Sequence, residues 1–389
     1  MSSPDVVVIG AGIVGAACAL AAARAGLAVT VLDRGTIFGG ASSGGEGNLL
    51  VSDKPAGPEL ALAQHSLAHW DEVSEHLAEV TGLPGGGIEL ERKGGLMVAA
   101  TAATLTRLEQ IAAGQRAMGI EATAVGPAGL RELEPQLAPG LAGGMLYPQD
   151  GQLQPMLATA TLLAAARRLG AVVRTHIEVT GFLRRGSRVT GVELSGGARI
   201  ECAHVVNAAG AWAQPLAALA GVRVPVLPRR GVVLVTQPLP PLIRRKVYAA
   251  EYVSNVASDA AGLESSAVVE GTPSGTVLIG ASRERVGFDP AMPVPVVRRL
   301  ATQAVALFPV LAGARLLRTY RGYRPYSPDH LPVIGEDPRA PGLVHACGHE
   351  GAGVVLAAGT GQLVAEILTG APPSADLTAV RPERFEGAA

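Results

Sequence analysis

The chain is poor in cysteine and carries almost no net charge. Only Cys18, Cys202 and Cys347 occur among 389 residues. Their odd number and irregular spacing predict no disulfide framework, no zinc site and no iron–sulfur cluster. We expect a cytoplasmic protein in a reducing compartment, with no bound metal. The formal net charge of −1 gives no reason to expect binding to nucleic acid or to an anionic membrane surface.

Long apolar runs are also missing. Gly or Arg interrupts the longest ones before they reach the length of about 18 residues that a membrane-spanning helix needs. The first residues, Met-Ser-Ser-Pro-Asp, contain no basic segment of the kind that opens a secretory signal. We therefore expect neither a spanning segment nor a signal peptide. Hydrophobic residues make up 48% of the chain, enough for a large core.

Glycine, in contrast, is abundant and occurs in patterned turns. Residues 5–33 read as a strand, a Gly-x-Gly-x-x-Gly turn at Gly10, Gly12 and Gly15, an alanine-rich helix, and a second strand that ends in Asp33. This order, with the acid close to the expected ~20 residues after the turn, is typical of a dinucleotide-binding unit. The alternative is a glycine-rich turn that binds nothing.

Each residue type in this unit has a chemical reason. Gly10 allows a sharp turn out of the strand, Gly12 lets a pyrophosphate approach the backbone, and Gly15 lets the helix lie close to the strand. The helix N-terminus offers free N–H groups to the phosphates. Asp33 can accept hydrogen bonds from a ribose diol and repels a 2′-phosphate, which favours FAD or NAD over NADP.

Two further small-residue turns follow apolar strands. Residues 205–212 read Val-Val-Asn-Ala-Ala-Gly-Ala-Trp, and residues 348–353 read Gly-His-Glu-Gly-Ala-Gly. Either could be ordinary close packing. The first also suits a chain beside a pyrophosphate, and the second directs helix N–H groups at a negative charge. The loop 39–48 is too glycine-rich for regular structure and suits a flat ligand.

Apolar periodicity predicts an α/β fold. We expect helices over 59–80, 103–118, 127–133, 155–169, 354–368 and within 290–307, and strands over 95–100, 143–147, 222–237, 276–282, 333–335 and 343–346, with several short strands in 171–206. The basic residues of 229–230 and 244–246 are expected to be solvated. Because nucleotide-type turns recur at three places, we expect two interleaved domains: a dinucleotide-binding domain over 1–75, 150–221 and 330–370, a second domain over 76–149 and 222–329, and a loosely ordered tail over 371–389.

These turns, together with Arg-Gly-Tyr-Arg-Pro-Tyr-Ser-Pro-Asp-His-Leu-Pro-Val-Ile-Gly at 321–335, resemble the D-amino-acid oxidase superfamily of FAD-dependent oxidoreductases. The resemblance runs from Val6 to about Leu368 and is strongest to the glycine oxidase and sarcosine oxidase branch. Within it, the chain resembles the flavin subunits of D-hydroxyproline dehydrogenase and hydrogen cyanide synthase. The resemblance implies a Rossmann-like FAD-binding domain and a mixed-sheet substrate domain.

The resemblance also implies which residues bind FAD. The matching positions are Gly10, Gly12, Ile13, Val14, Gly15, Asp33 and Arg34 in the first unit, Ala41, Ser42, Ser43, Gly44, Gly45, Gly47 and Asn48 in the following loop, Val179, Ala208, Gly210 and Trp212 in the middle, and Gly348, His349, Gly351, Gly353 and Val354 near the end. Sarcosine oxidases carry their flavin-linking cysteine at the position of Gly322, so we expect FAD to be bound non-covalently.

Three residues are implied in catalysis. Arg324 matches the arginine that holds the substrate carboxylate, and its planar fork is suited to that role. Tyr252 matches a tyrosine over the flavin, with Tyr248 as an alternative, and Asn48 lies in the flavin loop. Glu46 and Asn48 replace residues that are often small or apolar in the oxidases. The implied reaction is hydride transfer from the amine-bearing carbon of a small D-amino or imino acid, of the D-proline or hydroxy-D-proline type, to flavin N5. The product is an imine, and no protein base is expected.

Two other functions stay open at this point. A 2-hydroxyacid oxidoreductase would present the same carboxylate to Arg324. Alternatively, the chain could be the electron-transfer flavin subunit of a complex, since relatives pair with small iron–sulfur proteins. The electron acceptor could be oxygen, a quinone or such a partner.

Overall fold

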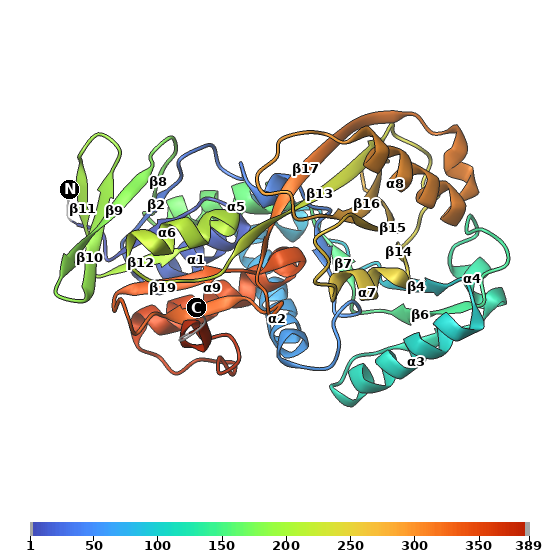
Figure 1. The fold of residues 1–389 in the computed structure, drawn as a ribbon, viewed down its shortest axis with the longest axis horizontal. Coiled ribbons are helices and arrows are strands. Elements are labelled where there is room, and N and C mark those ends of the chain that lie inside the picture. The colour runs from blue at the N-terminus through green and yellow to red at the C-terminus, as the bar shows by residue number, and fades with distance from the viewer. Residues whose placement is uncertain (1–2, 386–389) are drawn as a thin grey trace.

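The structure is a computed structural model and describes residues 3–385. It has two lobes, each built around one large β-sheet (Figure 1). Strands from the N-terminus and the middle of the chain share one lobe with the C-terminal helix, so the chain passes between the lobes more than once. The site described below lies where the lobes meet.

The first lobe contains a six-stranded sheet. Its order is β18 (Val333–Glu336), β19 (Leu343–Cys347), β12 (His204–Asn207), β1 (Val6–Ile9), β2 (Val29–Leu32) and β8 (Val172–Arg174). Neighbours run parallel except β18 and β19. Both faces are covered, which explains the unbroken apolar strands. Val6 and Val8 pack into one core, and Val7 and Ile9 into the other.

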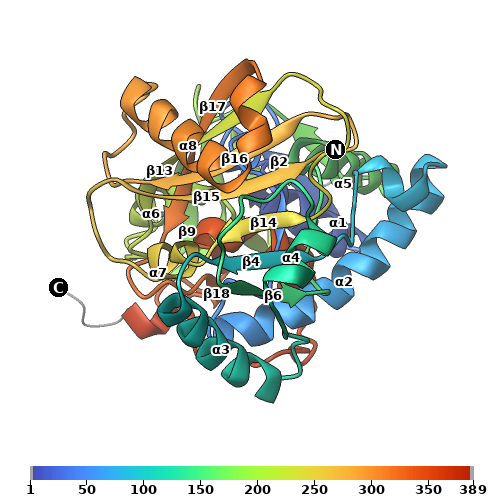
Figure 2. The ribbon, with the colours of Figure 1, turned by 90° about the vertical axis from the view of Figure 1, so that its right-hand side faces the viewer.

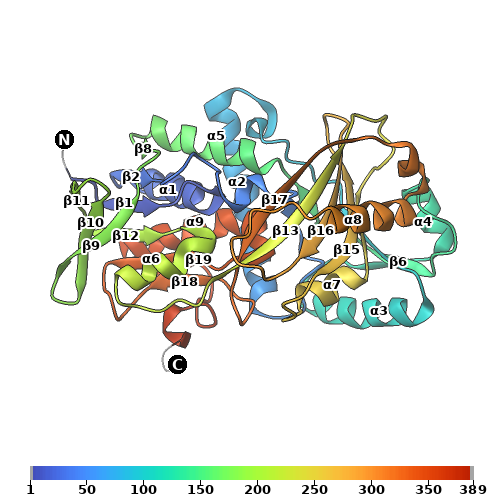
Figure 3. The ribbon, with the colours of Figure 1, turned by 45° about the horizontal axis from the view of Figure 1, so that its top comes forward.

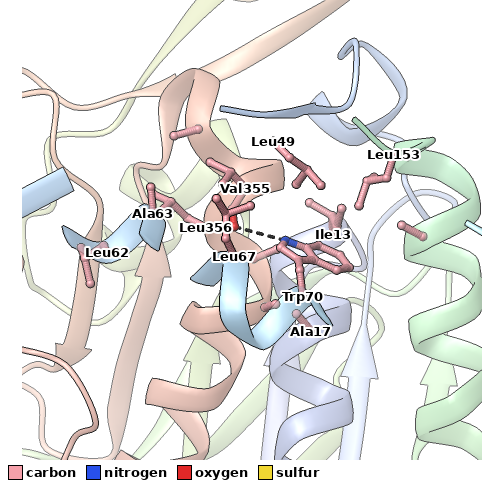
Figure 4. Close-up of a cluster of buried hydrophobic side chains, with 14 of the residues drawn as sticks. Ile13, Ala17, Leu49, Leu62, Ala63, Leu67, Trp70, Leu153, Val355 and Leu356 are labelled. Atoms are coloured by element: carbon pink, nitrogen blue, oxygen red, sulfur yellow. Dashed lines mark hydrogen bonds between the residues drawn. The ribbon is translucent and has the colours of Figure 1, made fainter. Parts of the chain in front are cut away.

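Four helices line the first of these cores: α1 (Ile13–Arg24), α2 (Pro58–Thr81), α5 (Pro155–Arg168) and α9 (Gly353–Thr369). Trp70 of α2 fixes the start of α9, because its indole N–H donates to the carbonyl oxygen of Val354 at 2.9 Å and to that of Val355 at 3.1 Å. Figure 4 shows the contact with Val355. The opposite face is covered by α6 (Ala213–Leu219) and by a small sheet of β9 (Val179–Arg185), β10 (Arg188–Leu194) and β11 (Arg199–Glu201).

One segment, Glu350–Thr369, has the length and apolar composition of a candidate membrane span. Within the protein, 72% of its most apolar window is buried. It consists of α9 with the short turn η5 (Glu350–Ala352) before it. The neighbouring helices bury α9, so within this fold it is a central helix of the core.

The second lobe contains an eight-stranded sheet (Figure 2). Its order is β17 (Leu316–Tyr326), β13 (Leu227–Thr236), β16 (Val277–Arg283), β15 (Glu264–Gly271), β14 (Lys246–Ala249), β4 (Gly95–Ala99), β6 (Gly143–Tyr147) and β5 (Thr123–Val125). Leu96 and Val98 of β4 pack into a core with α8 (Val294–Leu307), and Met97 and Ala99 face the opposite side. The remaining helices are α3 (Ala102–Ala117), α4 (Pro127–Leu133) and α7 (Glu251–Val256), and β3 (Asn48–Leu49) pairs with β7 (Gly151–Gln152).

The long strands β13 and β17 reach from the second lobe towards the first (Figure 3). The glycine-rich loop after β2 crosses β17 so closely that a Cβ at Gly44 would lie 2.5 Å from the Cα of Gly322. A side chain at either position would separate the loop from the strand. This crossing brings β17 beside the glycine-rich turns of the first lobe.

The predicted helices and the predicted strands are present, but other elements were missed and the expectation for the basic residues was wrong. The elements that were not predicted are the strands β3, β5, β7, β14, β15 and β17 and the helices α6 and α7. Arg229, Arg230 and Lys246 are buried and ion-paired rather than solvated.

The tail also differs from expectation over the described residues 371–385. Leu377 and Val380 are buried in the core of the first lobe, and the Ile334 amide donates to the Val380 carbonyl oxygen at 2.9 Å. Residues 386–389 lie outside the described part of the chain. All strands of the six-stranded sheet come from the segments 1–75, 150–221 and 330–370, while the boundaries themselves stay a prediction.

Candidate active site

The first glycine turn places its three glycines in different environments. A Cβ at Gly10, where φ is +113°, would collide with the Ala208 carbonyl, and a Cβ at Gly15 would collide with the Gly10 carbonyl oxygen. At Gly12, in contrast, the nearest neighbour of a Cβ is the Ser42 hydroxyl at 3.1 Å. Gly10 and Gly15 therefore allow the backbones to pack, and Gly12 leaves open the space in front of α1.

The start of α1 and the end of β2 carry the polar groups of this turn. The Ser42 hydroxyl accepts from the Ile13 amide at 2.9 Å. The Asp33 carboxylate accepts from the Ala11 amide at 2.7 Å and the Gly35 amide at 2.8 Å. One backbone bond on each carboxylate oxygen fixes Asp33 beside the turn and leaves further lone pairs for a ribose diol.

A cavity of about 570 Å³ begins at this turn and extends to β17. Of the residues predicted to bind FAD, those that line it are Gly10, Gly12, Ile13, Val14, Asp33, Arg34, Ala41, Ser42, Gly44, Gly45, Val179, Ala208, Gly210, Trp212, His349, Gly351, Gly353 and Val354. Gly15, Ser43, Gly47, Asn48 and Gly348 are not part of this lining. Arg324 lines the cavity as well.

The middle turn forms one wall of the cavity. The Arg34 guanidinium carbon lies 4.4 Å from the centroid of the Trp212 ring, which also stacks on Phe288 at 4.7 Å. Asn207 holds the turn from beneath, since its side-chain amide donates to the Ala213 carbonyl oxygen at 3.0 Å. The cavity thus runs from Asp33 and the glycine turn of the first lobe to Arg324 of the second, and its glycine-rich lining fits an extended dinucleotide such as FAD.

The C-terminal turn contributes His349 and Glu350. His349 is buried, its Nε2 lies 3.0 Å from the Thr360 hydroxyl, and burial lowers its pKa to about 3. The Glu350 carboxylate accepts from Arg229 Nη1 at 2.7 Å and lies 3.2 Å from His330 Nδ1. The hydrogen bond from His330 and the charges of nearby arginines hold the pKa of Glu350 below its usual range in spite of burial.

Arg324 enters the cavity from β17. Its Nη1 donates to the Ser282 carbonyl oxygen at 2.8 Å, and the absence of a side chain at Gly231 leaves room for the guanidinium. Burial, and then the like charge of Arg283, lower the pKa of Arg324. Among the described residues no carboxylate lies within ion-pair distance of Arg324, so its charge is available to an anion in the cavity.

The structure separates the two candidate tyrosines. Tyr248 is fully buried and its hydroxyl donates to Asp150 at 2.6 Å, with Ser52 as a further partner. Burial and the Asp150 charge raise its pKa well above the usual value. Tyr252 lies in α7 with the Arg283 guanidinium carbon 5.3 Å from its ring centroid. Tyr248 is therefore part of a buried polar network, and Tyr252 is the one beside the arginines.

Asn48 lies away from the cavity lining. Its side-chain amide donates to Glu46 at 3.3 Å, and its Oδ1 has no hydrogen-bond donor. Sequence reasoning missed Arg283, which follows directly on the buried strand residues Ala281 and Ser282. An arginine at the end of an apolar strand was the available signal, but nothing local in the sequence shows that it lies beside Arg324.

Comparison with known proteins identifies the family. The DAO family model, described as FAD dependent oxidoreductase, matches residues 5–367. Glycine oxidase of Geobacillus kaustophilus is 30% identical over 367 residues, which is 94% of this chain and 92% of that protein. Hydrogen cyanide synthase subunit HcnC of Pseudomonas protegens is 32% identical over 260 residues, 66% of this chain; the match spans 58% of HcnC, little more than half of its length.

Solved structures agree with this match. The crystal structure of glycine oxidase from Geobacillus kaustophilus has a TM-score of 0.89 at 29% identity and covers 99% of this chain and 100% of its own. That of L-proline dehydrogenase from P. horikoshii has a TM-score of 0.87 at 25% identity, covering 100% and 99%. The α/β fold of two interleaved domains and the FAD cofactor predicted from the sequence are thereby confirmed. The chain belongs to the DAO family of FAD-dependent oxidoreductases.

Proposed function

We propose that this enzyme oxidises the C–N bond of a small amino or imino acid, with D-proline and hydroxy-D-proline as the first compounds to test. The observation that carries the proposal is Arg324, a guanidinium without an ion-pair partner among the described residues, in the wall of the FAD cavity. The names of the relatives, glycine oxidase and L-proline dehydrogenase, support a substrate that carries both an amine and a carboxylate.

Non-covalently bound FAD supplies a two-electron acceptor. The residues listed above that line the cavity would hold it, with Asp33 at the ribose and the start of α1 at the phosphates. Arg324 would bind the substrate carboxylate through two parallel hydrogen bonds and so orient the carbon that is oxidised. Tyr252 would cover the substrate. A protein base is not required, because the substrate amine can lose its proton to water.

The electron acceptor and the compartment belong to the same proposal. HcnC is named as a subunit of hydrogen cyanide synthase, which supports a partner protein as one possible acceptor. The three cysteines of this chain do not form a cluster-binding motif, so an iron–sulfur group would have to come from that partner. The cysteine content also supports a cytoplasmic location.

An anaerobic titration tests the proposal. The purified yellow protein is mixed with D- and L-amino acids, cyclic imino acids and 2-hydroxyacids, and the flavin absorbance near ~450 nm is followed. We expect bleaching by amine-bearing acids. Bleaching by 2-hydroxyacids alone would overturn the C–N assignment, and bleaching by none of the compounds would favour an electron-transfer subunit. Readmitting air then separates an oxidase from a dehydrogenase.

A further inference from the structure

A second arginine beside Arg324 has neither a hydrogen-bond nor an ion-pair partner among the described residues. Arg283 ends β16 and the residue is only 3% exposed. Its Nη1 contacts no hydrogen-bond acceptor, and over residues 3–385 no carboxylate lies within ion-pair distance of it. A buried guanidinium in this state is unfavourable, because it has given up its water without gaining an anion.

The other buried arginines of the described residues form ion pairs with carboxylates. Arg229 is fully buried and pairs with Glu264 and Glu350, and Arg230, 4% exposed, pairs with Glu284 and Asp289. The fold thus supplies two carboxylates to each buried arginine that serves structure. Arg283 is the exception, and it lies next to the candidate substrate site.

Several contacts place Arg283 at that site. Its guanidinium carbon lies 5.3 Å from the centroid of the Tyr252 ring. The preceding residue, Ser282, accepts the hydrogen bond from Arg324 through its carbonyl oxygen at 2.8 Å. The charge of Arg283 is close enough to lower the pKa of both Arg324 and Glu350. Two of these neighbours, Arg324 and Glu350, line the cavity itself.

The nearby acids of the described residues form no ion pair with either arginine. The carboxylate oxygens of Glu350 are engaged by Arg229 and His330. Glu46 is 7% exposed and accepts from Asn48 at one oxygen, while its Oε1 meets no donor. The site therefore presents two guanidinium groups without an ion-pair partner among residues 3–385, while Glu46 lines a separate cavity beside Gln152 and Tyr320.

We propose that Arg283 binds a second carboxylate of the substrate, so that the enzyme prefers amino or imino dicarboxylic acids. This inference rests on the proposed function and narrows it. Arg324 would hold the carboxylate next to the oxidised carbon, and Arg283 would hold the distant one. Among compounds of the proposed class, dicarboxylic acids are then better substrates than D-proline.

Pairs of compounds that differ only in the second acid group test this. Both enantiomers of glutamate and glutamine, of aspartate and asparagine, and iminodiacetate with its monoamide are compared by anaerobic flavin reduction. The wild-type enzyme should show a kcat/KM at least about tenfold higher for the acid than for the amide of one pair, the effect of a charged hydrogen bond. In Arg283→Gln this ratio should fall to about one, with the amide little affected. The exposed Arg285, two residues further on, provides the control variant Arg285→Gln, which should keep the ratio.

A binding measurement gives a readout that does not depend on turnover. Glutarate, which has no amine, should perturb the flavin spectrum of the holoenzyme with a Kd at least about tenfold below that of glutaramate, and Arg283→Gln should abolish the difference. If Arg283→Gln does not fold, the acid-to-amide ratios of the wild-type enzyme still test the inference. Equal kcat/KM and Kd values for acid and amide in the wild type would overturn this inference and leave the proposed function standing. An equal loss of kcat/KM for both compounds in Arg283→Gln would do the same. No reduction by any amine-bearing acid would overturn the proposed function as well.

Discussion

Gly12 and Gly15 lie three residues apart in one turn, yet a methyl group would have opposite consequences at the two positions. At Gly15 it would collide with backbone, whereas at Gly12 it would extend towards the cavity and the Ser42 hydroxyl. We expect Gly12→Ala to fold normally but to bind FAD at least about tenfold more weakly. Gly15→Ala should lose about 1–3 kcal/mol of the free energy of unfolding.

Flavin content and urea unfolding of the two purified variants check this prediction. Gly126→Ala is the control, because a Cβ at Gly126 meets no atom within 4 Å. A Gly12→Ala protein with wild-type affinity for FAD would contradict the assignment of this turn to the pyrophosphate.

His349 gives the molecule a sensitivity to acid whose sign follows from its burial. Its pKa is about 3 in the folded protein and about 6.5 in an unfolded chain. Between these values the unfolded chain binds a proton that the folded chain does not, so the free energy of unfolding falls as the pH falls, by at most about 1.4 kcal/mol per pH unit. Above about pH 6.5 the contribution is fully present.

The variant His349→Asn should therefore show a shallower loss of stability between pH 6 and pH 4.5. Urea unfolding of the holoenzyme at several pH values measures this slope. His176→Asn is a suitable control because His176 is exposed and its positive φ of 57° is one that asparagine tolerates. An unchanged slope in His349→Asn would show that this histidine is not the titrating group.

At the scale of elements, close helix packing makes one glycine essential and another replaceable. A Cβ at Gly361 of α9 would lie 2.7 Å from the Ala17 carbonyl oxygen of α1. A Cβ at Gly114 of α3 would make ordinary contact with Ala56 at 3.5 Å. Alanine favours a helix over glycine by about 1 kcal/mol, so Gly114→Ala should stabilise the protein by about 0.5–1 kcal/mol.

Gly361→Ala should instead destabilise the protein by about 1–3 kcal/mol, because overpacking of α1 against α9 outweighs helix propensity. The two melting temperatures, measured side by side, test the pair. If both variants became more stable, the close approach of α1 and α9 would be wrong.

The same scale shows what sequence periodicity can and cannot predict. The helices α2, α3, α5 and α9 follow from local apolar spacing and were predicted almost to the residue. The strands β14 and β15 were missed because the buried pair of Lys246 and Glu270 gives them a polar, surface-like sequence. Strand β17 was missed for a different reason. It pairs with β13, and this contact between distant parts of the chain leaves no local pattern in the sequence.

For the whole molecule, the first glycine turn and Asp33 could be predicted because their chemistry is local: a strand, a turn and a helix within one short segment. The role of Arg324 came only from resemblance, and Arg283 was not found at all. Both arginines reach the site through the crossing of β13, β16 and β17 against the first lobe. Only the folded chain brings these strands to the FAD cavity, and no spacing in the sequence reports it.

The central claim is that Arg324 of the second lobe holds a carboxylate over the cofactor of the first. The most direct measurement compares the best substrate of the anaerobic panel with its α-amide, in the wild type and in Arg324→Met. We predict that the wild type reduces its flavin with a kcat/KM about 100-fold higher for the acid than for the amide, and that the variant, with its flavin spectrum intact, treats both alike. A variant that keeps the preference for the acid would contradict this account of the site.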